Sequence, residues 1–164
     1  MKAILRPASL LLFLLTITVN AQSTMAFIQG GDYIPLYGRD SLQVSVSDIH
    51  MDIYPVTNEE FLSFVQQNPQ WSRSKAKRLF VDENYLAGWE HDTLLGAGQS
   101  LKAPVTNISW FAAKAYCECQ GKRLPTVDEW EYVGMANEKM SDARILSSYN
   151  KFILSWYEKP KTFN

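Results

Sequence analysis

Hydrophobic residues in the first part of the chain follow the short period of β-strands. Met25–Ile28 is a short apolar run that is followed by the turn signal Gly30-Gly31. Between positions 42 and 47, Leu, Val and Val alternate with Gln, Ser and Ser, which is the period of a half-buried strand. A further extended stretch covers about Met51–Tyr54 and ends at Pro55. These patterns predict several short strands before residue 56.

Two later segments begin with the spacing of a capping box and continue with helical patterns. Thr57 and Glu60 stand three residues apart, as do Thr126 and Glu129, so each pair can exchange hydrogen bonds between side chain and backbone. After the first pair, an apolar stripe continues until Asn68-Pro69, where a helix must stop. The stripe consists of Phe61, Phe64 and Val65, and the second predicted helix carries Trp130 and Val133.

A third helix is predicted from Ser109 to about Gln120. Serine is a favoured N-cap, the body of the segment is rich in alanine, and Gly121 stands where a left-handed residue ends a helix. A last amphipathic stretch, Ser141–Trp156, is expected to form another helix that ends before Pro160. Its apolar face would contain Ile145, Tyr149, Phe152 and Trp156.

Residues 70–103 lack such a pattern and are predicted to form a long polar loop with at most one helical turn. The loop contains a basic run and three glycines. Trp71, Tyr85 and Trp89 lie within it, and we expect these aromatic side chains to anchor the loop to the rest of the protein.

The first 21 residues have the pattern of a secretory signal peptide. Lys2 and Arg6 precede the apolar stretch Ala8–Val19, and small residues then lead to a predicted cleavage site after Ala21. The apolar stretch is too short to span a bilayer, which needs about 20 residues. The sequence therefore predicts an exported protein with one domain at residues 22–164.

Charge and composition narrow the possible partners. Cleavage would remove two of the 16 basic residues and none of the 17 acidic residues, so the mature chain would carry 14 basic residues against 17 acidic ones. This weak negative charge gives no sign of a nucleic-acid surface. Aromatic residues make up 13% of the chain, which argues against general disorder.

The only cysteines, Cys117 and Cys119, lie two residues apart. On a helix they would point to different sides, so they would not easily form a disulfide. We expect one or both to be small buried residues. A metal site built on them would need further ligands, and His50 and His91 stand alone in the sequence.

The segment Pro104–Ala136 is the most specific motif, and it reads PVTNISWFAAKAYCECQGKRLPTVDEWEYVGMA. It resembles the signature of the formylglycine-generating enzyme family, whose members are also called sulfatase-modifying factors. Phe27–Gly38 and Asp52–Val65 resemble two earlier family segments, in the same order. The matching residues of the signature are Pro104, Val105, Ser109, Trp110, Ala113, Ala115, Tyr116, Cys117, Gly121, Lys122, Arg123, Leu124, Pro125, Thr126, Glu129, Trp130, Glu131 and Tyr132.

Much of this signature has a structural interpretation. Arg123 lies close in sequence to Glu129 and Glu131, and an ion pair with either one would join two helices. Three aromatic residues are expected to dominate a small core: Trp110, Tyr116 and Trp130. Cys119 stands where the family usually has tryptophan, so we also expect local repacking of that core.

The resemblance implies an α+β fold of the formylglycine-generating-enzyme type, which is similar to C-type lectins, irregular and rich in loops. It covers only about the first half of a typical family domain, so residues 22–164 are expected to form a partial sulfatase-modifying factor domain. Family enzymes oxidise a sulfatase cysteine to formylglycine, with oxygen and with copper held by two cysteines. Those cysteines and the calcium-binding segments belong to the second half of the domain. Cys117 is therefore assigned no role as nucleophile or copper ligand.

Three classes of function are compatible with this resemblance: an enzyme portion, a non-catalytic envelope protein and a ligand-binding module. We expect an exported, non-catalytic or truncated family member, periplasmic or extracellular, that acts as an envelope accessory or binding protein. The alternative is the N-terminal part of a copper-dependent oxidase.

The expected partner is another envelope protein or a polypeptide substrate, without nucleic acid and without a transmembrane helix in the mature chain. No catalytic residue is assigned, and no cofactor-binding or metal-binding residue is expected. An isolated partial domain should be only marginally stable.

Overall fold

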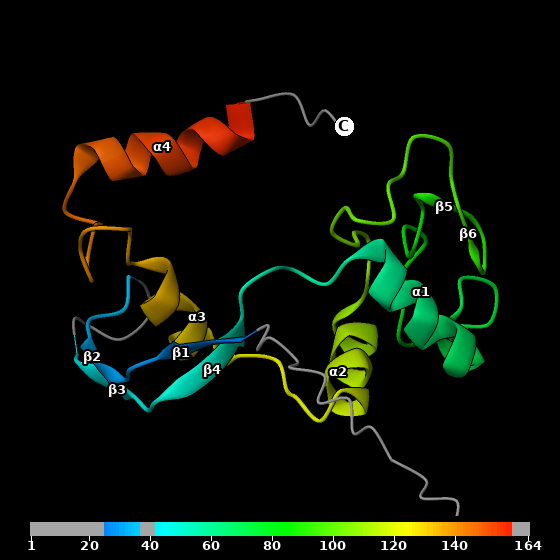
Figure 1. Cartoon of the computed structure of the whole chain (residues 1–164), viewed down its shortest axis with the longest axis horizontal. Coiled ribbons are helices and arrows are strands. Elements are labelled where there is room, and N and C mark those ends of the chain that lie inside the picture. The colour runs from blue at the N-terminus through cyan, green and yellow to red at the C-terminus, as the bar shows by residue number, and fades with distance from the viewer. Residues whose placement is uncertain (1–24, 37–41, 159–164) are drawn as a thin grey trace, which may run out of the picture.

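The computed structural model describes residues 25–36 and 42–158, which form an α+β fold with small sheets (Figure 1). The expected signal peptide and Pro160 lie outside the described residues. The strands pair antiparallel, β1 (Met25–Ile28) with β4 (Ile49–Asp52), β2 (Gly31–Tyr33) with β3 (Val44–Val46), and β5 (Trp89–His91) with β6 (Leu94–Leu95). The helices are α1 (Asn58–Gln67), the 3₁₀ helix η1 (Pro69–Trp71), α2 (Trp110–Cys119), α3 (Val127–Gly134) and α4 (Ser147–Glu158).

The elements gather in two groups (Figure 1). One group contains α1, α2 and the β5–β6 hairpin. The other contains α3 with the strand pairs β1–β4 and β2–β3, and α4 extends beyond it. Each group has its own cluster of buried residues.

The larger core forms where the apolar stripe of α1 meets α2 and the long loop. Phe61, Phe64 and Val65 are all at most 3% exposed, which confirms the predicted stripe. They pack with Tyr85, Leu86, Trp89 and Ala112. Asn58, 1% exposed, receives a hydrogen bond from the Trp89 indole and donates one to the Ser100 carbonyl. The loop is therefore anchored as predicted, by its aromatic residues and also by a buried amide.

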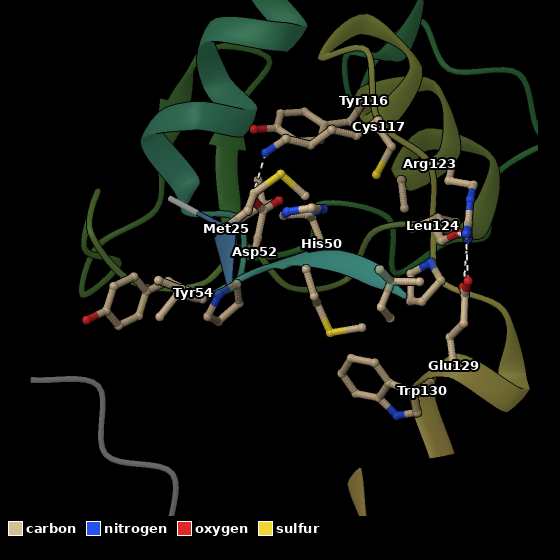
Figure 2. A pocket seen from close by; sticks show the side chains of 18 of the residues that line it. Met25, His50, Asp52, Tyr54, Tyr116, Cys117, Arg123, Leu124, Glu129 and Trp130 are labelled. Atoms are coloured by element: carbon tan, nitrogen blue, oxygen red, sulfur yellow. Dashed lines mark hydrogen bonds and ion pairs between the residues drawn. The ribbon is translucent and has the colours of Figure 1, made fainter. Parts of the chain in front are cut away.

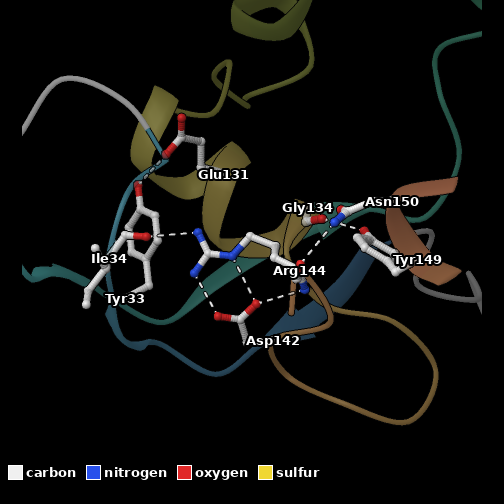
Figure 3. Close-up of polar contacts among 8 residues, drawn as sticks. All are labelled: Tyr33, Ile34, Glu131, Gly134, Asp142, Arg144, Tyr149 and Asn150. Atoms are coloured by element: carbon white, nitrogen blue, oxygen red, sulfur yellow. Dashed lines mark hydrogen bonds and ion pairs between the residues drawn. The ribbon is translucent and has the colours of Figure 1, made fainter. Parts of the chain in front are cut away.

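The smaller core is closed by a network of polar contacts (Figure 3). Tyr33 packs with Val46 and Met135, and its hydroxyl donates to carboxylates of α3. The Arg144 guanidinium pairs with Asp142 and donates to the Ile34 carbonyl at 2.8 Å. These contacts hold the chain that follows α3 against the end of β2.

The predicted N-caps of α1, α2 and α3 and the predicted ends of α1 and α2 are confirmed. Thr57 and Thr126 each form a complete capping box, and Ser109 caps α2 through the Ala112 amide. Gly121 has φ +67°, the left-handed conformation that a glycine adopts easily after a helix. Asn68 is the C-cap of α1, so that helix stops where the Asn-Pro pair predicts.

Several predictions about the core are wrong. Trp110 is 59% exposed and Trp130 is 64% exposed, so of the three signature aromatics only Tyr116 packs against a core. Cys119 is exposed as well, and it therefore neither fills a core position nor forces one to repack.

Two element boundaries also differ from expectation. The β5–β6 hairpin interrupts the loop that was predicted to lack strands. The last helix begins at Ser147 instead of Ser141, and Ile145 precedes it with 77% of its surface exposed. None of the described helices is long and apolar enough to cross a membrane.

Candidate functional site

A broad groove of about 1240 Å³ lies where β4, the end of α2 and the start of α3 meet (Figure 2). Residues of the signature, Gly121–Pro125, form one wall, and β4 forms the opposite wall. Val105, Ile108, Val133 and the rings of Tyr116 and Trp130 make its lining largely apolar. The turn at Gly121 shapes this wall, because its positive φ reverses the chain directly after α2.

The groove follows the edge of β4. Every residue from Asp48 to Val56 lines it, although successive side chains of a strand point to opposite faces. A surface that touches both faces of a strand must also run along the strand's edge. Among the described residues β4 pairs only with β1, so the edge on the other side lacks a partner strand.

Two ion pairs cross or border the groove, and they satisfy the charges of its walls. The Lys122 ammonium binds the Asp52 carboxylate at 2.6 Å and so joins the signature to β4. The Arg123 guanidinium binds both oxygens of Glu129, at 2.7 and 2.6 Å, which confirms the predicted pair and selects Glu129 over Glu131. The bonds from Arg123, together with the Thr126 amide, lower the pKa of Glu129 to about 2.

Cys117 is half-buried and lines the groove, whereas Cys119 is exposed and lies outside it. Burial, followed by the negative charge of Asp52, raises the pKa of the Cys117 thiol. The same two influences, with Glu60 added, raise the pKa of Tyr116 to about 12. Both groups are therefore protonated at neutral pH, and neither is prepared to act as a nucleophile.

The two histidines are not brought together. His50 lies on β4 in the groove, beside the Phe27 ring at a centroid distance of 5.3 Å. His91 lies on β5, next to Glu90 and away from this groove. Among the described residues, no cluster of three or more His, Cys, Asp or Glu side chains is suited to hold a metal ion.

Comparison with known proteins identifies the protein family. The model of the sulfatase-modifying factor enzyme 1-like domain matches residues 16–144. The chain belongs to the sulfatase-modifying factor family. The match contains β4, α2 and α3, and thus every element that forms the groove.

The relatives of the chain include one protein that is named as inactive and others that are named as enzymes. The chain is 30% identical over 131 residues to inactive C-alpha-formylglycine-generating enzyme 2 of Mus musculus, covering 62% of this chain and 42% of that protein. It is 32% identical over 118 residues to the formylglycine-generating enzyme of Mus musculus, covering 55% of this chain and 31% of that protein. It is also 30% identical over 114 residues to serine/threonine-protein kinase Pkn1 of Chlamydia trachomatis, covering 65% and 18%. The chain thus spans less than half of each of these relatives.

The described residues do not fit the copper site that the family enzymes imply. A thiolate pair must converge on one ion. Cys117 and Cys119 stand two residues apart on α2, where side chains diverge around the helix, and the pKa of the Cys117 thiol is raised.

The groove was not predictable as a site from the signature alone, because its second wall is β4. The long-range pair Asp52–Lys122 joins these walls across 70 residues of sequence.

Proposed function

We propose that this protein is a non-catalytic sulfatase-modifying-factor-like protein that binds another envelope protein or a polypeptide in its groove. The observation that carries this proposal is the chemistry of the groove. Its lining is largely apolar, its lysine and arginine are paired with carboxylates, and the pKa of the Cys117 thiol is raised. Such a surface favours recognition of a partner over transfer of a chemical group.

The fold type supports a binding role by analogy. We infer that the α+β arrangement corresponds to part of a formylglycine-generating-enzyme fold of the C-type-lectin-like kind. Similarity to both an enzyme and an inactive relative leaves the activity to be decided by the site itself. The placement of Cys117 in the groove and of Cys119 outside it supports the non-catalytic role.

Export is a further part of the proposal, and it places the binding role in the periplasm or outside the cell. The N-terminal pattern of two basic residues, an apolar stretch and a small-residue site supports it. Intact-mass measurement of protein expressed in its natural host should give a chain that begins at Gln22. Recovery of a chain that begins at Met1 or Lys2 would contradict export.

The non-catalytic role is tested with copper and with a substrate peptide. Cu(I) competition titrations should give the same weak binding for the wild type, Cys117→Ser and Cys119→Ser. A sulfatase-derived peptide that contains the target cysteine should keep its mass when incubated with the protein, copper and oxygen. Tight binding of Cu(I) that is lost in the serine variants, or conversion of the peptide, would instead support the N-terminal part of a copper-dependent oxidase.

A further inference from the structure

The open edge of β4 is the part of the groove best suited to bind another chain. A strand with one partner presents unpaired backbone groups along its other edge, and such edges readily accept a further strand. β4 carries no lysine and no proline within Ile49–Asp52, which are the residues that commonly prevent pairing. All four residues of β4 line the groove.

The sequence of β4 is complementary to itself. In an antiparallel pair of two β4 strands with a twofold axis at Met51, His50 of each copy faces Asp52 of the other. Ile49 then faces Ile53, which is 54% exposed, and the two Met51 side chains face each other. This register places the isoleucine and methionine pairs on one face of the sheet. On the other face, each His50 imidazole lies opposite an Asp52 carboxylate.

One carboxylate oxygen of Asp52 is available for this contact. Lys122 binds only Oδ1 of Asp52, and no partner of Oδ2 is found within the described residues. His50 is exposed, and Figure 2 shows that it projects from β4 on the same side as Asp52. An imidazole N–H from a second copy can therefore donate to Oδ2 while the Lys122 bond is retained.

We propose that two copies of this protein associate through the open edges of their β4 strands, in the register that places Met51 opposite Met51. The association is symmetric, because each copy offers the same strand and the same groove to the other. It rests on the proposed binding role of the groove, with a second copy as the bound polypeptide. The two proposals fail separately, because copper binding and peptide conversion test the non-catalytic role, whereas the oligomeric state tests the association.

The first test is the mass of the purified protein in solution. Sedimentation equilibrium over roughly 1–100 µM should show a monomer and a dimer in exchange. His50→Asp places an acid opposite Asp52 twice in each dimer and should weaken association roughly tenfold, whereas His50→Lys should preserve or strengthen it. Both variants change the same exposed position, so differences in folding do not explain opposite effects.

Met51→Lys provides a second variant, since the twofold axis would bring two lysines face to face. Leu79→Lys is its matched control, because Leu79 is 81% exposed and lies outside the groove. We expect the Met51 variant to be a monomer and the Leu79 variant to associate like the wild type. A protein that is monomeric throughout, or a dimer equally sensitive to both changes, would overturn the proposal.

Crosslinking tests the register directly. In a background with Cys117→Ser and Cys119→Ser, Met51→Cys should form an intermolecular disulfide on mild oxidation, because residue 51 faces itself. Leu79→Cys in the same background should remain largely monomeric. Efficient crosslinking at position 79, with none at position 51, would show that another surface joins the copies. Capture of a different polypeptide at an unchanged, monomeric β4 edge would also refute the self-association.

Discussion

The Glu129 carboxylate closes the capping box of α3 and also binds the Arg123 guanidinium. Its pKa is lowered from 4.5 to about 2, chiefly by the hydrogen bonds from Arg123. A carboxylate with a lowered pKa in the folded state stabilises the fold above its unfolded pKa, and this contribution is lost as the pH falls from about 4.5 towards 2. The shift corresponds to about 3 kcal/mol at most.

Screening by solvent reduces the stabilisation from the Arg123–Glu129 pair, because 63% of the Arg123 side chain is exposed. We therefore expect Glu129→Gln to lower the free energy of unfolding by about 1–2 kcal/mol at pH 7, with the difference from wild type vanishing near pH 2. Urea unfolding at several pH values measures this. Glu118→Gln is the control, since its surface pair with Lys114 contributes about 0.5 kcal/mol or less. Identical pH profiles for the two variants would contradict the assignment.

The two cysteines should differ in reactivity although they lie on the same helix. Cys119 is exposed, while Cys117 is half-buried with its thiol pKa raised by burial and by Asp52. At pH 8 we expect iodoacetamide to modify Cys119 roughly tenfold faster than Cys117, because the thiolate is the reactive form. Peptide mass spectrometry over a time course gives both rates. In concentrated urea the rates should become similar, and equal rates in the folded protein would disprove the difference.

At the residue scale, local contacts were predictable, whereas burial was predicted correctly for the stripe of α1 and wrongly for Trp110 and Trp130. The Arg123–Glu129 pair follows from a six-residue separation around a capped turn, which local geometry largely determines. The exposure of Trp110 and Trp130 depends on which elements cover α2 and α3. A helical pattern identifies the apolar face of a helix but not the element that packs on it.

At the scale of elements, Gly121 and Gly134 form a matched pair for testing the helix ends. A Cβ added at either position meets no atom within 4 Å, so steric contacts are equivalent. Gly121 has φ +67°, whereas Gly134 ends α3 with no positive φ. We expect Gly121→Ala to destabilise the protein by about 1–2 kcal/mol and Gly134→Ala to be neutral or stabilising by up to about 1 kcal/mol. Thermal unfolding of both variants tests this, and equal losses would show that backbone conformation does not govern the end of α2.

Capped helices were predictable because their signals lie within a few residues, as Thr57 and Thr126 show. The β5–β6 hairpin was missed because strands of three and two residues, with an irregular register, are too short to display a period. The groove was also beyond sequence reasoning. It requires β4 and the signature to meet in space, and only the folded chain brings Asp52 to Lys122.

At the scale of the whole molecule, the two separate cores suggest two units of different stability. The larger core joins α1, α2 and the anchored loop through seven buried residues, whereas the smaller one contains Tyr33, Val46 and Met135. Regions with few buried apolar contacts open at lower free energy than regions with many. Within the described part of the chain, no buried residue belongs to both clusters.

We therefore expect hydrogen exchange to be slowest in α1 and α2 and much faster in β2, β3 and α3. Phe61→Ala, at a fully buried position, should cost about 3–5 kcal/mol and accelerate exchange in the larger core. Because the smaller core does not contain Phe61, its amides should keep their rates until global unfolding. Hydrogen-exchange mass spectrometry of wild type and variant resolves the two regions. Uniform acceleration along the chain would instead mean that both cores unfold as one cooperative unit, with β1 and β4 coupling them tightly.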